Sequence, residues 1–199
     1  MKVTAIPAGI YDANCYIISD ENTKEAIVLD PGGDGEMLLK EITREGVKVK
    51  YILLTHGHAD HVGAVDFLAK NLKVSVYLSE EDQKFIEKDT SIFGSIKTNL
   101  KTIKEGDKFD FGNLTLKVIE TPGHTKGGVS FVTCDSIFTG DTLFKGSIGR
   151  TDFAGGDFDT EISSIKNKIL PLGDSTKVYP GHGPESTIEF EKKMNPYLQ

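Results

Sequence analysis

The chain has 199 residues, of which 38% are apolar and 27% are charged, as expected of one ordinary globular domain. Its net charge of −7 and its scattered lysines and arginines argue against nucleic acid or an anionic membrane as a partner. No apolar run reaches the roughly 20 residues that span a bilayer, and the first residues do not resemble a signal peptide. Two cysteines, Cys15 and Cys134, are too few for a disulfide framework, so we expect the protein in the cytoplasm. The length predicts a single domain, residues 1–199.

The first part of the chain predicts hairpins that are followed by alternating strands and helices. Three runs rich in β-branched and aromatic residues predict strands over residues 2–9, 14–20 and 25–33. Apolar residues at helical spacing then predict a helix over residues 34–47 that ends near Gly46. Further strands are predicted over residues 49–55 and 73–79, and further helices over residues 61–72 and 80–88.

The second part of the chain returns to strands. Residues 89–99 have no clean period and predict a loop or lid. Strand-like runs with hairpin-type breaks cover residues 108–121, 127–134 and 135–141, and a short strand covers residues 176–181. Helices are predicted over residues 159–170 and 186–194, the second capped by Ser186 or Thr187. This pattern indicates an α/β layered fold with substantial sheet.

Four predicted strands are each followed by a loop that carries His or Asp beside Gly. The loops read THGHADH (residues 55–61), TPGHT (121–125), TGDT (139–142) and YPGHG (179–183). Loops at the carboxyl ends of strands are where α/β proteins place ligands, so we expect these four to converge on one point. They contain all five histidines of the chain, which favours a shared site over five unrelated surface residues.

The spacing of these residues indicates how they could hold metal ions. His56 and His58 point the same way on an extended segment and can share one ion, whereas Asp60 and His61, at the turn into a helix, can address a second. The remaining donors come from the other three loops: His124, His182 and Asp141. Nitrogen and carboxylate donors suit Zn²⁺, Fe or Mn, and two such ions about 3.5–4 Å apart generate a nucleophile at neutral pH. A barrel amidohydrolase, which also uses an H-x-H pair, is typically about 250 residues long and is set aside on length.

The segments THGHADHVG, PGHT, GDTLF and YPGHG together resemble the metallo-β-lactamase superfamily, and the likeness runs from NCYII near the start to NPYL near the end. The resemblance implies an α/β fold, a four-layer αβ/βα sandwich with two metal ions at one edge of two facing sheets. It also implies the ligands of the first ion (His56, His58 and His124), those of the second (Asp60, His61 and His182), a bridging Asp141, and Asp30 in VLDPGG as a brace of the site.

Within this superfamily, NCYII, GDTLF and TPGHTKGG are most similar to the glyoxalase II branch, the hydroxyacylglutathione hydrolases. This resemblance implies hydrolysis of a small, anionic thioester by attack of a metal-bridging hydroxide on the carbonyl, with Asp60 as the catalytic residue that orients the hydroxide. Zinc is the expected metal, with iron or manganese as alternatives, and another small ester or lactone is an alternative substrate. Lactam hydrolysis is set aside, because β-lactamases of this fold are exported and often use a cysteine where this chain has Asp141.

The segment GRTDF, residues 149–153, stands where glyoxalase II presents a lysine and a tyrosine to glutathione. Arg150 could replace that lysine as a carboxylate anchor, whereas Asp152 would repel an anionic group. GRTDF also resembles the persulfide dioxygenases of the same fold, which implies an alternative function with a single iron ion held by His56, His124 and Asp141.

Three residues beside the site loops are candidate substrate contacts. Arg150 and Lys145 could attract an anionic substrate, and Phe144 could wall the pocket. The alternatives are an ordinary solvated charge for Lys145 and simple packing for Phe144. The sequence leaves open the metal, the acyl group and the oligomeric state.

Overall fold

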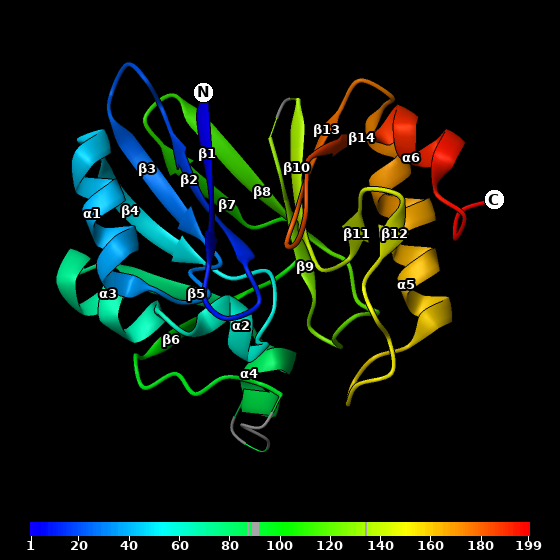
Figure 1. Ribbon diagram of the computed structural model, residues 1–199, viewed down its shortest axis with the longest axis horizontal. Helices are drawn as coiled ribbons and strands as arrows, with labels where there is room; N and C mark the ends of the chain where they lie inside the picture. The colour runs from blue at the N-terminus through cyan, green and yellow to red at the C-terminus, as the bar shows by residue number, and fades with distance from the viewer. Residues whose placement is uncertain (87, 89–91, 134) are drawn as a thin grey trace.

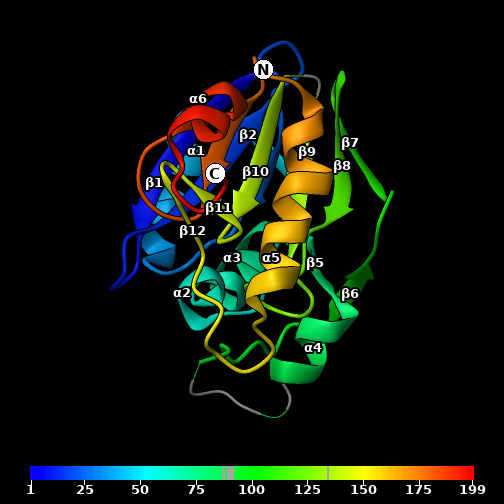
Figure 2. The same ribbon diagram turned by 90° about the vertical axis from the view of Figure 1, so that its right-hand side faces the viewer.

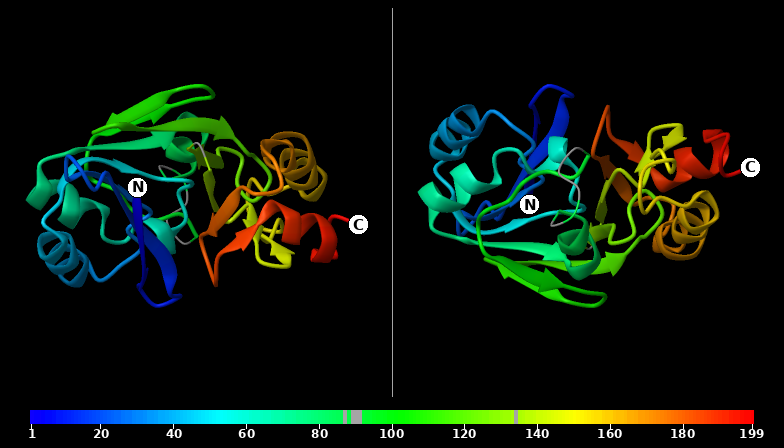
Figure 3. Two further views of the ribbon diagram at one scale, coloured as in Figure 1. Left: turned by 90° about the horizontal axis from the view of Figure 1, so that it is seen from above. Right: turned by 90° about the horizontal axis from the view of Figure 1, so that it is seen from below.

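Two six-stranded sheets pack face to face, and helices cover the outer face of each (Figures 1 and 3). This computed structural model describes residues 1–86, 88, 92–133 and 135–199. Cys134, one residue of the predicted helix over 80–88 and the first three of the predicted loop or lid over 89–99 lie outside the described residues. The arrangement is the predicted α/β four-layer sandwich, with the order helices, sheet, sheet, helices.

The amino-terminal sheet has the strand order β1-β2-β3-β4-β5-β6. Its strands are β1 (Lys2–Ala8), β2 (Ala13–Ser19), β3 (Glu25–Leu29), β4 (Lys48–Leu53), β5 (Ser75–Ser79) and β6 (Leu100–Ile103). The first three pair antiparallel, and β3 to β6 pair parallel. The predicted hairpins followed by strand–helix alternation are therefore confirmed, with β6 as an additional strand.

The helices of this half are α1 (Gly35–Glu45), α2 (Ala59–Val62), α3 (Val65–Leu72) and α4 (Glu80–Ile86). Gly46 caps α1 with a positive φ of 65°, as predicted. The helix predicted over residues 61–72 is instead two helices, α2 and α3. The backbone of Gly63 between them lies so close to Gly32 that a Cβ would stand 2.4 Å from the Gly32 carbonyl oxygen.

The carboxy-terminal sheet has the order β14-β13-β10-β9-β8-β7. Its strands are β7 (Lys108–Phe111), β8 (Leu114–Glu120), β9 (Val129–Val132), β10 (Ser136–Gly140), β13 (Lys177–Pro180) and β14 (Ser186–Thr187). The run predicted over residues 108–121 is thus a β7–β8 hairpin. A two-stranded ribbon of β11 (Leu143–Phe144) and β12 (Ser147–Ile148) was not predicted from the sequence.

Figure 2 shows α5 and α6 lying over the carboxy-terminal sheet. The helical segments here are α5 (Phe158–Ser164), the π-helical η1 (Ile165–Ile169), the 3₁₀-helical η2 (Leu170–Leu172) and α6 (Ile188–Met194). Thr187 caps α6 by accepting a hydrogen bond from the Phe190 amide, which confirms the predicted cap. No helix of the described chain is both long and apolar enough to cross a membrane.

The core explains why several of the predicted strands are rich in apolar residues on both faces. In β2, Cys15 and Ile17 pack in the layer between the first sheet and its helices, while Tyr16 and Ile18 pack between the two sheets. A third cluster joins the second sheet to η1 and α6. In the central strands β2, β3 and β10 both faces are covered, so alternate side chains enter different cores and both sets are buried. In contrast, β1, β7 and β8, toward the sheet edges, mix buried or half-buried residues with exposed ones.

Candidate metal centre

The four polar loops meet at one end of the sandwich, as predicted, although their strands come from two facing sheets. β4 belongs to the first sheet, and its loop carries His56 and His58. β8, β10 and β13 belong to the second sheet and run in the same direction, because β8 and β10 both pair antiparallel with β9 and β10 pairs parallel with β13. Their carboxyl ends therefore lie at one edge, which faces the β4 loop.

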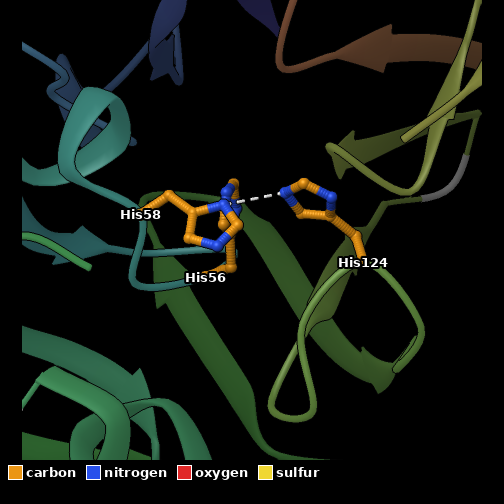
Figure 4. Close-up of side chains that lie close together, drawn as sticks. All are labelled: His56, His58 and His124. Carbon is orange, nitrogen blue, oxygen red and sulfur yellow. Dashed lines mark hydrogen bonds between the residues drawn. The ribbon is translucent and has the colours of Figure 1, made fainter. Parts of the chain in front are cut away.

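The first group of donors consists of three buried histidines. His56, His58 and His124 are 2%, 5% and 5% exposed, and each offers a ring nitrogen within 4.8 Å of the others. Figure 4 shows His124 pointing from its own loop toward the two histidines of the β4 loop. The closest pair is His58 Nδ1 and His124 Nε2 at 2.9 Å. We call these three residues the enclosed group.

The second group of donors is more open. His182 Nε2 lies 3.2 Å from Asp60 Oδ2 and 3.4 Å from His61 Nε2. His61 is fully buried, but the side chains of Asp60 and His182 are 21% and 28% exposed. We call these three residues the open group.

Asp141 lies between the two groups. Its Oδ1 is 3.3 Å from His61 Nε2 in the open group, and its Oδ2 is 3.5 Å from His124 Nε2 in the enclosed group. Oδ2 is also 3.6 Å from His182 Nε2. One carboxylate therefore reaches donors of both groups, which is the position that a bridging ligand requires.

Asp30 fixes the orientation of two of the histidines. Its carboxylate accepts hydrogen bonds from the Thr55 amide (2.7 Å) and the Thr55 hydroxyl (2.6 Å), and it lies 3.1 Å from His61 Nδ1. The Thr55 hydroxyl is in turn 3.0 Å from His56 Nδ1. With the Nδ1 atoms occupied as donors, the Nε2 lone pairs of His56 and His61 point into the site.

His124 is held from two sides. Its Nδ1 donates to the Arg150 carbonyl oxygen at 2.7 Å, and its backbone amide donates to Glu161 Oε2 at 2.9 Å. The second contact places a buried carboxyl directly behind the loop, and burial raises the pKa of Glu161 to about 9. These contacts leave His124 Nε2 free to face the other two histidines.

The charge states of His56, His58 and Asp141 suit cation binding. Burial lowers the pKa of His56 well below its usual range and, together with His124, lowers that of His58 to about 3, so both rings are neutral and carry a lone pair. Burial opposes ionisation of Asp141, but His61 and His124 lower its pKa below the usual range. A neutral imidazole and an ionised carboxylate are the forms that bind a metal ion.

The histidines of the open group differ in their charge state. Burial opposes protonation of His61, but Asp141 and Asp30 raise its pKa well above the usual range. The contact with Asp60 raises the pKa of His182. A metal ion would therefore have to displace a proton there.

The unpaired atoms and the chemistry of the donors fit divalent cations. His56 Nε2 and His58 Nε2 are buried and have no hydrogen-bond partner among the described residues. An unpaired buried polar atom costs free energy, so such atoms are expected where a ligand supplies the partner. Imidazole nitrogens and carboxylate oxygens are ligands of Zn²⁺, Fe and Mn.

A cavity of about 670 Å³ opens onto the centre. It is lined by Asp60, His182 and other donors of the site, and its apolar walls are formed by Tyr11, Ile92, Phe144, Ile148 and Phe153. The described part of the segment over 89–99 is tied to the β4 loop, because the Ala59 amide donates to the Ile92 carbonyl and the Gly94 amide to the Gly57 carbonyl. A small organic molecule fits this volume.

The structure separates the three candidate substrate contacts. Phe144 and Arg150 line the cavity. Lys145 is not part of the lining, and its Nζ lies 5.4 Å from the centre of the Phe190 ring. The Arg150 guanidinium donates to both carboxylate oxygens of Asp152, at 2.8 and 2.7 Å, and stacks 3.6 Å from the Phe153 ring centre. Arg150 was expected to attract an anionic group and Asp152 to repel it. In the structure the two side chains form one ion pair at the cavity.

Two buried carboxyls near the centre were missed from the sequence. Glu161 stands within a predicted helix and carries no motif. Asp82 lies on α4, directly after β5, and burial raises its pKa to about 6. A signal was present, since an acidic residue soon after a strand matches the other site loops. Its neighbours Glu80 and Glu81 made it resemble the ordinary acidic first turn of a helix.

Comparisons with known proteins agree with this geometry. Residues 8–182 match the Metallo-beta-lactamase superfamily. The Haemophilus influenzae protein named hydroxyacylglutathione hydrolase GloC is 39% identical, over 100% of this chain and 98% of its own length. The crystal structure of BLEG-1, described as a B3 metallo-beta-lactamase, is 37% identical with a TM-score of 0.92, and both chains are covered completely. TTHA1623, solved in a di-iron-bound form, is 33% identical with a TM-score of 0.88, over 98% of this chain and 100% of that one.

Proposed function

Because the chain belongs to the metallo-beta-lactamase superfamily, we propose that it is a hydrolase that uses two divalent metal ions to cleave a small thioester. The observation that carries this proposal is the position of Asp141, whose carboxylate lies 3.3 Å from His61 and 3.5 Å from His124. A single-ion site would not need a carboxylate in contact with both groups. The name of the 39% identical relative, hydroxyacylglutathione hydrolase, supports a glutathione thioester as the first substrate to test.

The two ions would be held by the enclosed and the open group, with Asp141 shared. Zinc is the expected metal, and iron is supported by the di-iron form of the 33% identical TTHA1623. When bound, two such ions acidify a water molecule and polarise the carbonyl oxygen of the substrate. The remaining contributions come from the side chains of this chain.

Asp60 is the proposed catalytic residue. Its carboxylate lies on the cavity wall, 3.2 Å from His182 Nε2, and remains partly exposed. It can accept a hydrogen bond from the attacking water and hold that water toward the carbonyl carbon. The contact with His182 lowers the pKa of Asp60, against the effect of burial, so the carboxylate is ionised at neutral pH.

The substrate would occupy the apolar cavity beside the centre. The acyl group would face Asp60, and the thiol portion would extend along Phe144 and Phe153 toward Arg150 at the rim. A thiol with a pKa of about 8.5 is a good leaving group, so the reaction needs no strong general acid. An anionic thiol portion would compete with Asp152 for the Arg150 guanidinium.

Hydrolysis of S-D-lactoylglutathione by zinc-loaded protein tests the proposal, with chelator-treated protein as the control. We expect turnover that the chelator abolishes and that zinc restores. Oxygen consumption with glutathione persulfide, in place of thioester hydrolysis by protein loaded with zinc or iron, would contradict the proposal and support the one-iron alternative that uses His56, His124 and Asp141. A β-lactam assayed in parallel tests the activity that BLEG-1 is named for, and faster turnover of the β-lactam would also contradict the proposal.

A further inference from the structure

Asp82 is a completely buried carboxylate outside the two groups of metal donors. It lies on α4, with no exposed surface, and belongs to neither the enclosed nor the open group. It accepts three hydrogen bonds of 2.8–2.9 Å. Its Oδ2 accepts from the Gly57 amide and the Thr125 hydroxyl, and its Oδ1 accepts from the Gly127 amide. Three donors of this kind offset much of the cost of burying the charge.

These three donors come from the two loops that carry the enclosed group. Gly57 stands between His56 and His58 on the β4 loop, whereas Thr125 directly follows His124 on the β8 loop. The two loops belong to different sheets, and no backbone ladder joins β4 to β8. The Val129 amide at the start of β9 donates to the Thr55 carbonyl at 2.9 Å, and beyond that point one carboxylate on a third element, α4, links the two loops.

The fit around Asp82 is tight. A Cβ on Gly127 would lie 2.2 Å from Ser79 Oγ and 2.6 Å from Asp82 Oδ1, so only glycine lets the β8 loop approach α4 this closely. On the other loop, His58 packs edge-on against the buried ring of Phe93, with 4.8 Å between ring centres. The loops are thus packed against fixed neighbours, and Asp82 supplies polar contacts to both of them in addition to the direct contact between His58 and His124.

We propose that Asp82 is a positioning residue of the metal centre, which sets the metal affinity of the enclosed group by holding its two loops at the correct separation. The proposal rests on the proposed two-metal function and assigns different roles to Asp30 and Asp82. Asp30 contacts His61 and, through Thr55, His56. Asp82 acts on the other side of the enclosed group, where His58 and His124 meet.

The variants Asp82→Asn and Asp82→Ala test this role by metal affinity. Asparagine can keep the oxygen that accepts from Gly57 and Thr125 but turns an amide donor toward the Gly127 amide, whereas alanine removes all three contacts. Loss of an outer contact of this kind weakens metal binding by about 10–100-fold. We expect one of the two ions to bind more weakly in Asp82→Asn, and more weakly still in Asp82→Ala, while the other ion keeps its wild-type affinity.

Asp66→Asn is a matched control for a purely structural effect. Asp66 also lies on a helix, α3, and also accepts hydrogen bonds from a loop, namely from the Lys97 and Thr98 amides and the Thr98 hydroxyl. It touches neither metal-binding loop. Its substitution is expected to lower the melting temperature of the metal-free protein and to leave both metal affinities unchanged.

Competition with a chromophoric zinc chelator gives the two dissociation constants, and thermal unfolding of the metal-free proteins confirms that each variant is folded. If Asp82→Ala fails to fold, the isosteric Asp82→Asn alone decides the outcome. A folded Asp82→Asn protein that binds both ions as tightly as wild type would overturn the inference and leave the proposed function intact. Wild-type protein that binds fewer than two ions would overturn both.

Discussion

The two ends of the sandwich are both joined across the sheets by a buried aspartate, but with different consequences. At the end away from the metal centre, Asp20 follows β2 and accepts hydrogen bonds from the Asn113 amide (2.7 Å) and side chain (2.9 Å), in the β7–β8 turn. At the metal end, Asp82 joins the β4 loop to the β8 loop.

The groups around the two aspartates explain the difference. Near Asp20 the polar atoms of the Asn113 side chain and the Asn22 amide find partners within the protein. At the metal end, buried histidine nitrogens such as His56 Nε2 have no partner among the described residues. At the first end the named polar groups are satisfied within the protein, whereas the second holds unpaired nitrogen atoms in place for a ligand, at a cost in stability.

The largest effect is expected from Asp141→Ala, because this side chain reaches both groups of donors. The variant should retain its fold, lose metal ions and lose thioester hydrolysis by more than the roughly 100-fold that an outer contact contributes. Elemental analysis after dialysis and turnover of S-D-lactoylglutathione measure the two effects. Wild-type metal content and turnover in this variant would show that Asp141 is not shared between ions.

Two single substitutions distinguish the enclosed group from the open group. His58→Ala removes a donor of the enclosed group and His182→Ala removes one of the open group, whose side chain is 28% exposed. We expect each variant to lose a different ion, with the ion of the enclosed group retained in His182→Ala. Metal content per chain and competition with a chelator distinguish them. Loss of both ions in both variants would mean that the groups do not bind independently.

Asp20→Asn is expected to change stability without changing metal binding. Hydrogen bonds from the Asn113 and Asn22 amides lower the pKa of Asp20 to about 2, from an ordinary value of 3.8. A carboxyl with a lowered folded-state pKa stabilises the fold fully above its unfolded pKa, and this contribution is lost as the pH falls through the folded pKa. The free energy of unfolding of wild type should therefore be larger than that of Asp20→Asn at about pH 7, and this difference should be smaller at about pH 3. Denaturant unfolding of the metal-free proteins measures this, and an equal difference at both pH values would refute the assignment.

The smallest effect is expected at the cavity wall. Phe144 lines the cavity, and its ring centre lies 6.1 Å from that of His182. Phe144→Ala should raise the KM for the thioester a few-fold, by removing apolar contact, and should leave the metal content unchanged. Phe67→Ala is the control and should leave KM unaltered, because Phe67 is an exposed ring on α3 that does not line the cavity. A large loss of kcat in Phe144→Ala would assign that ring a role in the reaction itself.

Much of this architecture could be predicted because the relevant signals are local. The central strands are rich in apolar residues since both of their faces are covered, and Gly46 ends α1 while Thr187 begins α6 by contacts within a few residues. The donor residues stand out for the same reason, because each lies in the polar segment that follows a strand. Convergence of the loops then follows from the direction of the strands.

What could not be predicted depends on partners that are distant in the sequence. Asp82 contacts Gly57 and Gly127, which are 25 and 45 residues away, and its position soon after a strand did not distinguish it from the acidic first turn of an ordinary helix. The strand β6 and the β11–β12 ribbon were missed because segments of four and two residues carry too little pattern. The break between α2 and α3 arises from the approach of Gly63 to Gly32, which is also a tertiary contact.

Titration of zinc into metal-free protein, with hydrolysis of S-D-lactoylglutathione followed at each step, tests the central claim most directly. The claim is that the enclosed and open groups each hold one ion and act together on a thioester. It predicts that full turnover is reached only at two ions per chain, and that Asp141→Ala does not reach it at any zinc concentration. Full turnover at one ion per chain, or no thioester hydrolysis at two, would contradict it.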